Sequence, residues 1–304
     1  MFPPPQTLNS EVFAELPAAF RRPRASRWSE ANRGGAALHS FLEGPSFDRD
    51  GNLYVVDIAH GRVFRISPEG LFNLVAEYDG EPNGLKIHRD GRIFLADYRN
   101  GLMELDPVRG EVTKLFDGRW TEHFKGLNDL FFAANGDLYF TDQGQTGLHD
   151  PTGRVYRFTT SGRLEKLVDT VPSPNGLVMD LAESALLVAV TRGNSVWRLP
   201  LMPDGSASKV GIFIQLSGGP GGPDGMALDA EGNLAVAHAG LGSVWVFDPH
   251  GEPLWRIRSC AGRLTTNLAY GGVDGRTLFI TESETGSILA AHLRVGGKTM
   301  FSHA

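Results

Sequence analysis

The chain has 304 residues, of which 41% are hydrophobic and 21% are charged, and it carries a net charge of −6. This acidic balance argues against a nucleic-acid partner, which requires a basic face, and the single cysteine, Cys260, excludes an internal disulfide and a cysteine-based metal cluster. No apolar run is long enough to cross a membrane, and the first residues lack the charged and apolar regions of a signal peptide, so we expect a cytoplasmic protein without a membrane partner.

The first 34 residues are predicted to form an N-terminal extension that packs outside the main fold. Within it, residues 10–20 are consistent with one short helix that begins at Ser10 as the N-cap, although Pro17 fits poorly inside such a helix. The basic residues 21–24 are interpreted as a solvated segment.

From residue 35 onward, the chain repeats a unit in which a short turn leads into an apolar strand. Equivalent turns recur at roughly the 40–50-residue spacing of a propeller blade, and Asp-Gly, Asn-Gly or Glu-Gly turns separate the strands inside each unit, as in β-hairpins. No segment between them keeps a helical period, which argues against a TIM barrel. The turns contain Glu43-Gly44, Asn83-Gly84, Asn128-Asp129, Asn175-Gly176, Asp224-Gly225 and Asn267-Leu268.

Six units of about four strands predict an all-β fold, a six-bladed β-propeller that residues 35–304 form as a single domain. Closure into a ring covers the edges and the apolar face that a lone four-stranded sheet leaves open. The last unit, from Thr266 to about Leu293, lacks a fourth strand. Residues 36–41 are one candidate for this strand, and residues 298–301 are the alternative.

The residues in four of these turns favour a metal site. In a propeller the first strand of each blade is innermost, so its beginning lies at the central channel and equivalent turns converge there. Two carboxylates and two amide oxygens, with no His or Cys, favour one hard divalent cation: Ca²⁺ first, with Mg²⁺, Mn²⁺ or Zn²⁺ as alternatives. Four protein ligands leave positions open for water or substrate, as a catalytic metal requires. The predicted ligands are Glu43, Asn128, Asn175 and Asp224.

Together, these motifs resemble the SMP-30/gluconolactonase/luciferin-regenerating enzyme-like family, and the resemblance extends from Glu43 to about Leu293. It implies a six-bladed propeller with one divalent cation at the channel mouth, held by the four residues named above. It also implies hydrolysis of lactones or, in one branch, of phosphotriester-like esters, with Asp224 as general base or nucleophile. The motifs are Glu43-Gly44-Pro45, Leu127-Asn128-Asp129, Pro174-Asn175-Gly176-Leu177, Pro223-Asp224-Gly225-Met226 and residues 150–156.

Sugar-lactone hydrolases of this family usually carry an arginine two residues before the third-unit Asn, a position that Gly126 holds here. Lys125 is the neighbouring cation, but its point charge does not reproduce a planar guanidinium. We therefore name Lys125 as a candidate substrate-binding residue, together with Asn83, Asn267 and Asp142, each of which has a structural alternative as a turn or loop residue. Candidates for a second layer around the site are His123, His149 and His238.

The predicted function is hydrolysis of a lactone, in which the cation polarises the carbonyl and Asp224 activates a water. A hydrolase that uses the same site on a non-sugar ester or an organophosphate is one alternative, and a non-catalytic propeller that binds a partner is another. No nucleophile-elbow, phosphate-loop or dinucleotide motif occurs, and the glycine-rich residues 218–223 open no helix, so we interpret them as a loop beside Asp224. The expected partner is a small lactone or ester.

Overall fold

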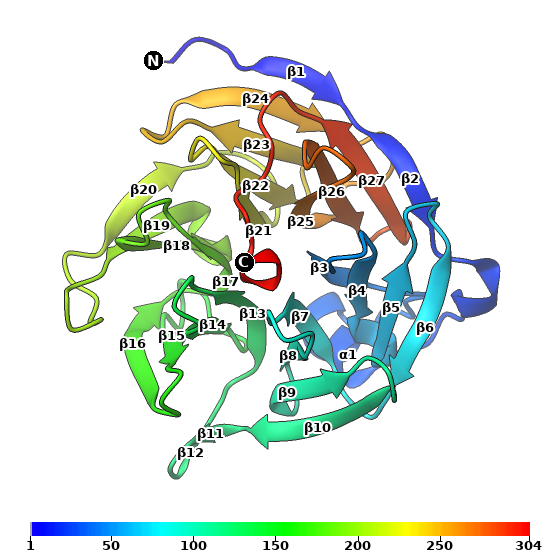
Figure 1. The fold of residues 1–304 in the computed structure, drawn as a ribbon, viewed down its shortest axis with the longest axis horizontal. Helices are drawn as coiled ribbons and strands as arrows, with labels where there is room; N and C mark the ends of the chain where they lie inside the picture. The colour runs from blue at the N-terminus through cyan, green and yellow to red at the C-terminus, as the bar shows by residue number, and fades with distance from the viewer. Residues whose placement is uncertain (1) are drawn as a thin grey trace.

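Six antiparallel sheets surround one axis in the computed structural model, which describes residues 2–304 (Figure 1). This arrangement confirms the predicted six-bladed β-propeller. In each blade the first strand of the repeat unit itself is innermost, so the beginnings of these six strands line one central channel. Within residues 2–304, no helix combines the length and the apolar character that a membrane crossing requires.

The strands of the first three blades follow one another in chain order. Blade one contains β3 (Leu42–Phe47), β4 (Leu53–Asp57), β5 (Arg62–Ile66) and β6 (Phe72–Glu77). Blade two contains β7 (Pro82–Ile87), β8 (Ile93–Asp97), β9 (Gly101–Asp106) and β10 (Glu111–Phe116). A small hairpin, β11 (Gly118–Arg119) and β12 (Glu122–His123), leads to blade three, which contains β13 (Leu127–Phe132), β14 (Leu138–Asp142), β15 (Gly153–Phe158) and β16 (Leu164–Val171).

The remaining blades differ in how they are completed. Blade four contains β17 (Pro174–Met179), β18 (Ala185–Val190), β19 (Ser195–Pro200) and β20 (Gly211–Gln215). Blade five contains β21 (Gly222–Leu228), β22 (Leu234–Ala239), β23 (Ser243–Phe247) and β24 (Pro253–Arg258). Blade six takes only three strands from its own unit: β25 (Thr265–Gly271), β26 (Thr277–Glu282) and β27 (Ser287–His292).

The N-terminal segment supplies the missing strand of blade six. β2 (Glu11–Glu15) pairs antiparallel with β27, and β1 (Gln6–Asn9) adds a fifth, parallel strand to β24 of blade five. The predicted helix over residues 10–20 is therefore wrong, and only η1 (Ala18–Phe20) forms a helical turn there. The open hydrogen-bonding edge of β27 outweighs the weak helical preference of so short a segment. The latch predicted from residues 36–41 is also wrong, because they form no strand of the ring. The domain boundary at residue 34 stays a prediction.

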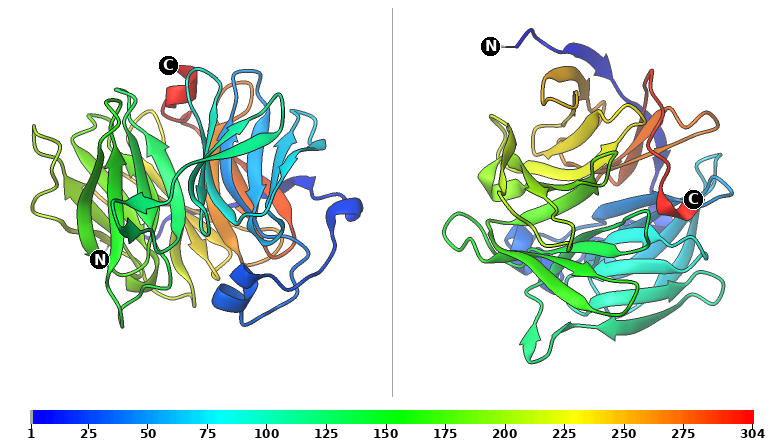
Figure 2. Two further views of the ribbon diagram at one scale, coloured as in Figure 1. Left: turned by 90° about the horizontal axis from the view of Figure 1, so that it is seen from below. Right: turned by 60° about the vertical axis from the view of Figure 1, so that its left-hand side comes forward.

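A short helix, α1 (Arg27–Arg33), covers one end of the ring, and the C-terminal residues cover the other (Figure 2). Ser26 caps α1 by accepting a hydrogen bond from the Ser29 amide, and Gly34 ends the helix with a φ of 61°. The buried Trp28 packs against Phe41, which anchors α1 to the entrance of blade one.

The C-terminal residues cross the opposite end of the channel without forming a strand, so the alternative latch from residues 298–301 is wrong as well. The Lys298 amide donates to the Leu228 carbonyl of blade five over 2.9 Å. The ring of Phe301, in η4 (Phe301–His303), stacks on Phe132 of blade three with the ring centroids 5.4 Å apart. The chain thus spans the channel from blade five to blade three.

The hydrophobic core lies between neighbouring blades. A strand in the middle of a blade packs on both faces, and every residue of β18, the second strand of blade four, is buried. Between blades one and two, the core contains Val56 and Val63 from one sheet and Leu85 and Leu95 from the other. This continuous packing holds the channel-lining ends of the inner strands at fixed positions.

Candidate metal centre

Each innermost strand carries a β-bulge near its beginning, at the end of the channel that α1 covers. The register shifts at Glu43/Ser46, Pro82/Gly84, Leu127/Leu130, Pro174/Leu177, Pro223/Met226 and Thr265/Asn267. A bulge leaves one residue unpaired and re-aims its side chain. The four predicted ligands all lie in or at the edge of these bulges, on four different blades.

The residue after each candidate ligand packs against the neighbouring inner strand. In four blades it is a glycine, and a Cβ atom on Gly176 would lie only 2.5 Å from the Asp224 carbonyl oxygen. A Cβ atom on Gly84 would lie 2.7 Å from the Asn128 carbonyl oxygen. Glycine therefore allows the inner strands to approach closely at this level of the channel. Blades three and six have a polar residue at this position instead.

Asp129 and Asn267 occupy equivalent positions in blades three and six. The amide of Asp129 donates to the Thr141 hydroxyl, and the amide of Asn267 donates to the Thr281 hydroxyl, over 3.1 and 2.9 Å. Each side chain also accepts from the amide of the residue that follows it. Asn267 thus lies one residue beyond the position that the turn motifs predicted for it, and Thr266 corresponds to the candidate ligands.

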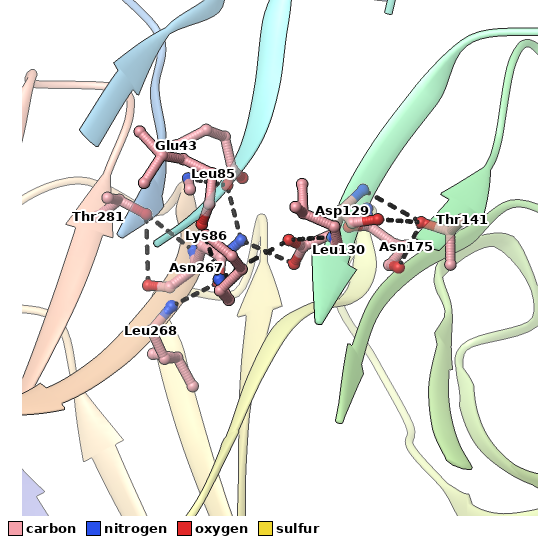
Figure 3. Close-up of polar contacts among 11 residues, drawn as sticks. Glu43, Leu85, Lys86, Asp129, Leu130, Thr141, Asn175, Asn267, Leu268 and Thr281 are labelled. Carbon is pink, nitrogen blue, oxygen red and sulfur yellow. Dashed lines mark hydrogen bonds and ion pairs between the residues drawn. The ribbon is translucent and has the colours of Figure 1, made fainter. Parts of the chain in front are cut away.

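Asn267 connects two buried carboxylates across the channel. Its Nδ2 donates to Glu43 Oε2 over 2.9 Å and to Asp129 Oδ2 over 3.1 Å (Figure 3). Glu43 Oε2 also accepts from the Gly44 amide over 2.8 Å. Even so, burial and the negative charge of Asp129 raise the pKa of Glu43 to about 7. Two carboxylates here share one buried space without enough donors to stabilise both charges.

Asp224 belongs to the same electrostatic cluster. Burial raises its pKa well above the ordinary value of 3.8, and the charges of Glu43 and Asp129 raise it further. The nearby Asn175 amide lowers this pKa, and Arg192 does so more weakly. Glu43, Asn175 and Asp224, from blades one, four and five, therefore lie within electrostatic reach of one another.

The amide of Asn128 is oriented by a chain of polar contacts. Its Nδ2 donates to Gln143 Oε1 over 2.8 Å, and Gln143 Nε2 donates to the Ser173 hydroxyl over 2.9 Å. With its nitrogen directed outward to Gln143, Asn128 has its amide oxygen free for another partner. Sequence reasoning missed Gln143, whose only signal was its place directly after the strand that ends at Asp142.

The chemistry of this group fits a hard cation. Oxygen ligands from two carboxylates and two amides suit Ca²⁺ or a similar divalent ion, and the raised pKa values of Glu43 and Asp224 indicate buried acids whose negative charges are only partly compensated. Among residues 2–304, no cluster of three or more His, Cys, Asp or Glu side chains is arranged for metal binding. A centre here would therefore depend on the amide oxygens as well as on Glu43 and Asp224.

Two of the predicted substrate-binding residues have structural contacts in blade three. The carboxylate of Asp142 accepts from the Lys125 and Gly126 amides over 2.7 and 2.9 Å and lies 3.3 Å from Arg154 Nη1. These contacts correspond to the structural alternative for Asp142, in which its carboxylate holds the loop that leads into blade three. The Lys125 ammonium hydrogen-bonds to the Thr152 hydroxyl.

The loop-holding carboxylate recurs around the ring. In blades one, two, three and six, the second strand ends at a buried acid. This acid accepts a hydrogen bond from a backbone amide in the segment that leads into the same blade. The acids are Asp57, Asp97, Asp142 and Glu282.

The other candidates lie at different depths. Asn83 is buried in its bulge. His238 is fully buried; its Nδ1 accepts from Trp245 Nε1 over 3.2 Å, and its Nε2 has no partner among the described residues. His123 and His149 are exposed. A Cβ atom on Gly219 would lie 2.8 Å from His238 Nε2, so the glycine-rich loop packs directly on this ring.

Comparisons with known proteins agree with this architecture. Residues 41–284 match the family model described as SMP-30/Gluconolactonase/LRE-like region. A lactonase drp35 from Staphylococcus aureus is 30% identical over 250 residues, which cover 77% of this chain and 73% of that protein. A gluconolactonase from Zymomonas mobilis is 29% identical over 272 residues, which cover 79% of this chain and 76% of that protein.

Among solved structures, a calcium-binding protein, regucalcin, from Agrobacterium tumefaciens has a TM-score of 0.78 and 21% identity, with coverage of 98% of this chain and 99% of that one. A gluconolactonase from Xanthomonas campestris has a TM-score of 0.74 and 22% identity, with coverage of 95% and 99%. At this level of identity, both likenesses show the fold.

Proposed function

Because the chain belongs to the SMP-30/gluconolactonase/LRE-like family, we propose that it is a divalent-metal-dependent hydrolase that opens a lactone. The family match confirms the resemblance predicted from the turn motifs. Relatives named lactonase and gluconolactonase support the activity. The observation that carries the proposal is the grouping of Glu43, Asp224 and Asn175 at one end of the channel. The pKa values of Glu43 and Asp224 are raised there, and a bound cation would stabilise their ionised forms.

In this proposal, the metal ligands are Glu43, Asn128, Asn175 and Asp224. A divalent cation, Ca²⁺ first, would supply electrophilic polarisation of the ester carbonyl when bound there. Gln143 holds the Asn128 amide in the orientation that presents its oxygen. Asn267 holds Glu43 in place through its hydrogen bond to Oε2.

Asp224 has the role of general base. As a whole residue Asp224 is partly exposed, whereas Glu43 is buried. A carboxylate in this position takes a proton from the attacking water. Asn83 and Lys125 are assigned to substrate contact, while Asp142 supports Lys125 by holding its backbone.

A second candidate function is hydrolysis of a non-sugar lactone or ester at the same site. It is favoured by the position of Gly126, which has a φ of +150° and would place a Cβ atom 2.7 Å from the Tyr98 ring. An arginine at this position is therefore excluded while Tyr98 keeps its place. Without that guanidinium, the candidate site has fewer donors for the hydroxyl groups of a sugar, so it suits a less hydroxylated ring.

The test is hydrolysis of glucono-1,5-lactone and of an aromatic lactone, dihydrocoumarin, before and after chelation with EDTA and after addition of Ca²⁺, Mg²⁺ or Mn²⁺. We expect activity that EDTA abolishes and one of the cations restores. Asp224→Asn is expected to bind the cation more weakly, by calorimetry, and to lose turnover. Full turnover in that variant would remove the general-base role, and no hydrolysis of either lactone with any cation would contradict the proposal.

A further inference from the structure

A cavity of about 620 Å³ lies at the end of the channel opposite the candidate metal ligands. The innermost strands of all six blades line it, and none of the four candidate ligands does. The C-terminal residues 297–300 and His303 border its outer side. It is therefore a separate compartment from the candidate metal centre.

Polar side chains form the boundary between the two compartments. Asp129 and Asn267 hydrogen-bond across the channel, and the Lys86 ammonium lies beside them, 4.0 Å from Asp129 Oδ1 (Figure 3). Lys86 lines the cavity, whereas Glu43, which accepts a hydrogen bond from Asn267, does not. The cavity therefore has a charged inner end.

The walls of the cavity are predominantly apolar. The residues come from different blades and present aliphatic or aromatic side chains, among them Phe47, Phe131, Val178, Met226 and Leu268. An apolar ligand would displace water from these surfaces, which favours its binding. A volume of this size is within the range of small-molecule sites in proteins.

Lys86 is the cation at the inner end of this apolar space, and it retains hydrogen-bonding capacity. Its Nζ donates to the Leu85 carbonyl over 3.0 Å, while Asp129 at 4.0 Å is beyond hydrogen-bond distance. An ammonium has three donors, so at least one stays available. The side chain is 13% exposed, and the cavity provides this exposure.

The cations at the outer border are already engaged. Arg49 donates to the Ser302 carbonyl over 2.9 Å, and Lys298 lies 3.0 Å from Glu183. The C-terminal residues are also held at Leu228 by the Lys298 amide. An anionic group that enters the cavity would therefore find its open partner at Lys86 and not at the border.

We propose that this cavity is a second ligand site, which binds an apolar monocarboxylate of the medium-chain fatty-acid type. The carboxylate accepts a charge-assisted hydrogen bond from Lys86, and the chain lies along the apolar walls toward the C-terminal residues. This inference does not depend on the proposed hydrolase activity, because it uses neither the candidate ligands nor a bound cation.

The experiment measures binding of dodecanoate by calorimetry, with dodecanol as the uncharged analogue, to the full-length protein. Lys86→Met is expected to weaken dodecanoate binding at least tenfold and to leave dodecanol binding unchanged. Ala227→Phe, which fills space at a partly exposed wall position, is expected to weaken both ligands. Lys114→Met is the matched control, because Lys114 lies on the outer strand β10, away from the cavity.

Binding should also persist after EDTA treatment and in Asp224→Asn, since the site is separate from the candidate metal centre. Thermal melting of each variant checks that it is folded. Three results would overturn the proposal: no saturable binding of dodecanoate to the unmodified protein, equal binding by Lys86→Met and Lys114→Met, or loss of binding on chelation.

Discussion

Asn267 Nδ2 lies 3.1 Å from Asp129 Oδ2, in a hydrogen bond that joins blade six to blade three, on opposite sides of the ring. The same nitrogen donates to Glu43. One neutral amide thus serves two acids in a buried space, and it does so because blades three and six lack the glycine that the other four blades have at this position. The candidate metal centre rests on this polar layer.

Asn267→Asp replaces the shared donor with a third acid beside Glu43 and Asp129. We expect the metal-free protein to lose at least ~2 kcal/mol of unfolding free energy, because buried like charges lose their hydrogen bond and repel one another. Urea unfolding in EDTA measures this loss. Added Ca²⁺ should recover part of it, so the stabilisation by Ca²⁺ should be larger in the variant than in the unmodified protein. Equal stability of the two metal-free proteins would contradict the inferred role of Asn267.

The stability of the metal-free protein should fall as the pH rises. The pKa of Glu43 is about 7 in the folded protein, against an ordinary value of 4.5, and the pKa of Asp224 is shifted in the same direction. The folded state therefore keeps protons that the unfolded chain has lost, so the resulting stability is complete below about pH 4.5 and is lost as the pH approaches 7.

Thermal melting in EDTA across this pH range measures the effect. A saturating divalent cation should reduce the decrease, because the cation favours the ionised carboxylates. A metal-free protein whose melting temperature rises over the same range would contradict the raised pKa values.

Lys86→Met should tighten the binding of a divalent cation. The ammonium lies 4.0 Å from Asp129 and supplies a positive charge to the acidic cluster. It therefore repels a divalent cation that binds to the same cluster. We expect a decrease in the Kd for Ca²⁺ of several-fold, measured by calorimetry at low ionic strength. Lys86→Arg keeps the charge and should leave the Kd near its original value. A weaker affinity in Lys86→Met would show that the lysine supports the centre in another way.

The repeated architecture was predictable because each blade carries its own turn and strand signals. The closing strand was not, because β2 and β27 are separated by more than 270 residues and the pairing leaves no local pattern in residues 11–15. Phe13 packs edge-on against Phe279 at 4.9 Å, a contact that becomes visible only in the folded ring. Short segments with mixed preferences take the structure that their tertiary surroundings offer.

The place of the candidate ligands in the turns that open the innermost strands was predictable, whereas their role as ligands stays a prediction. The polar layer beneath them was not predicted. A bulge shifts the register by one residue, so sequence alignment of the turns placed Asn267 beside Asn128 when its partner is Asp129. The matching hydrogen bonds that the backbone amides of Asp129 and Asn267 donate to the hydroxyls of Thr141 and Thr281 reveal the true equivalence. Gln143 was not predicted for a similar reason. Its contact with the amide of Asn128 joins two different strands of blade three and leaves no local sequence pattern.

Removal of the N-terminal strands provides a graded test of ring closure. A protein that lacks residues 1–9 loses β1, an additional strand on blade five, and should remain folded with a small decrease in melting temperature. A protein that lacks residues 1–16 also loses β2 and the buried Leu16, which uncovers the edge of β27. We expect this second protein to lose at least ~3 kcal/mol and to associate through the open edge. Size-exclusion chromatography and thermal melting compare the two truncated proteins. The same association state and the same melting temperature in both would contradict the role of β2 in closing the ring.

Gly225→Ala tests whether close strand approach positions the polar layer. A Cβ atom at residue 225 would overlap the side chain of Asn267, with its Cα only 2.6 Å away, so the added methyl group must displace the amide that serves Glu43 and Asp129. We expect a loss of ~1–3 kcal/mol from overpacking, together with weaker Ca²⁺ binding. Gly211→Ala is the control, because a Cβ atom at this position has no neighbour within 4 Å. If calorimetry gave the same Ca²⁺ affinity for both variants, the amide of Asn267 would not determine the geometry of the centre.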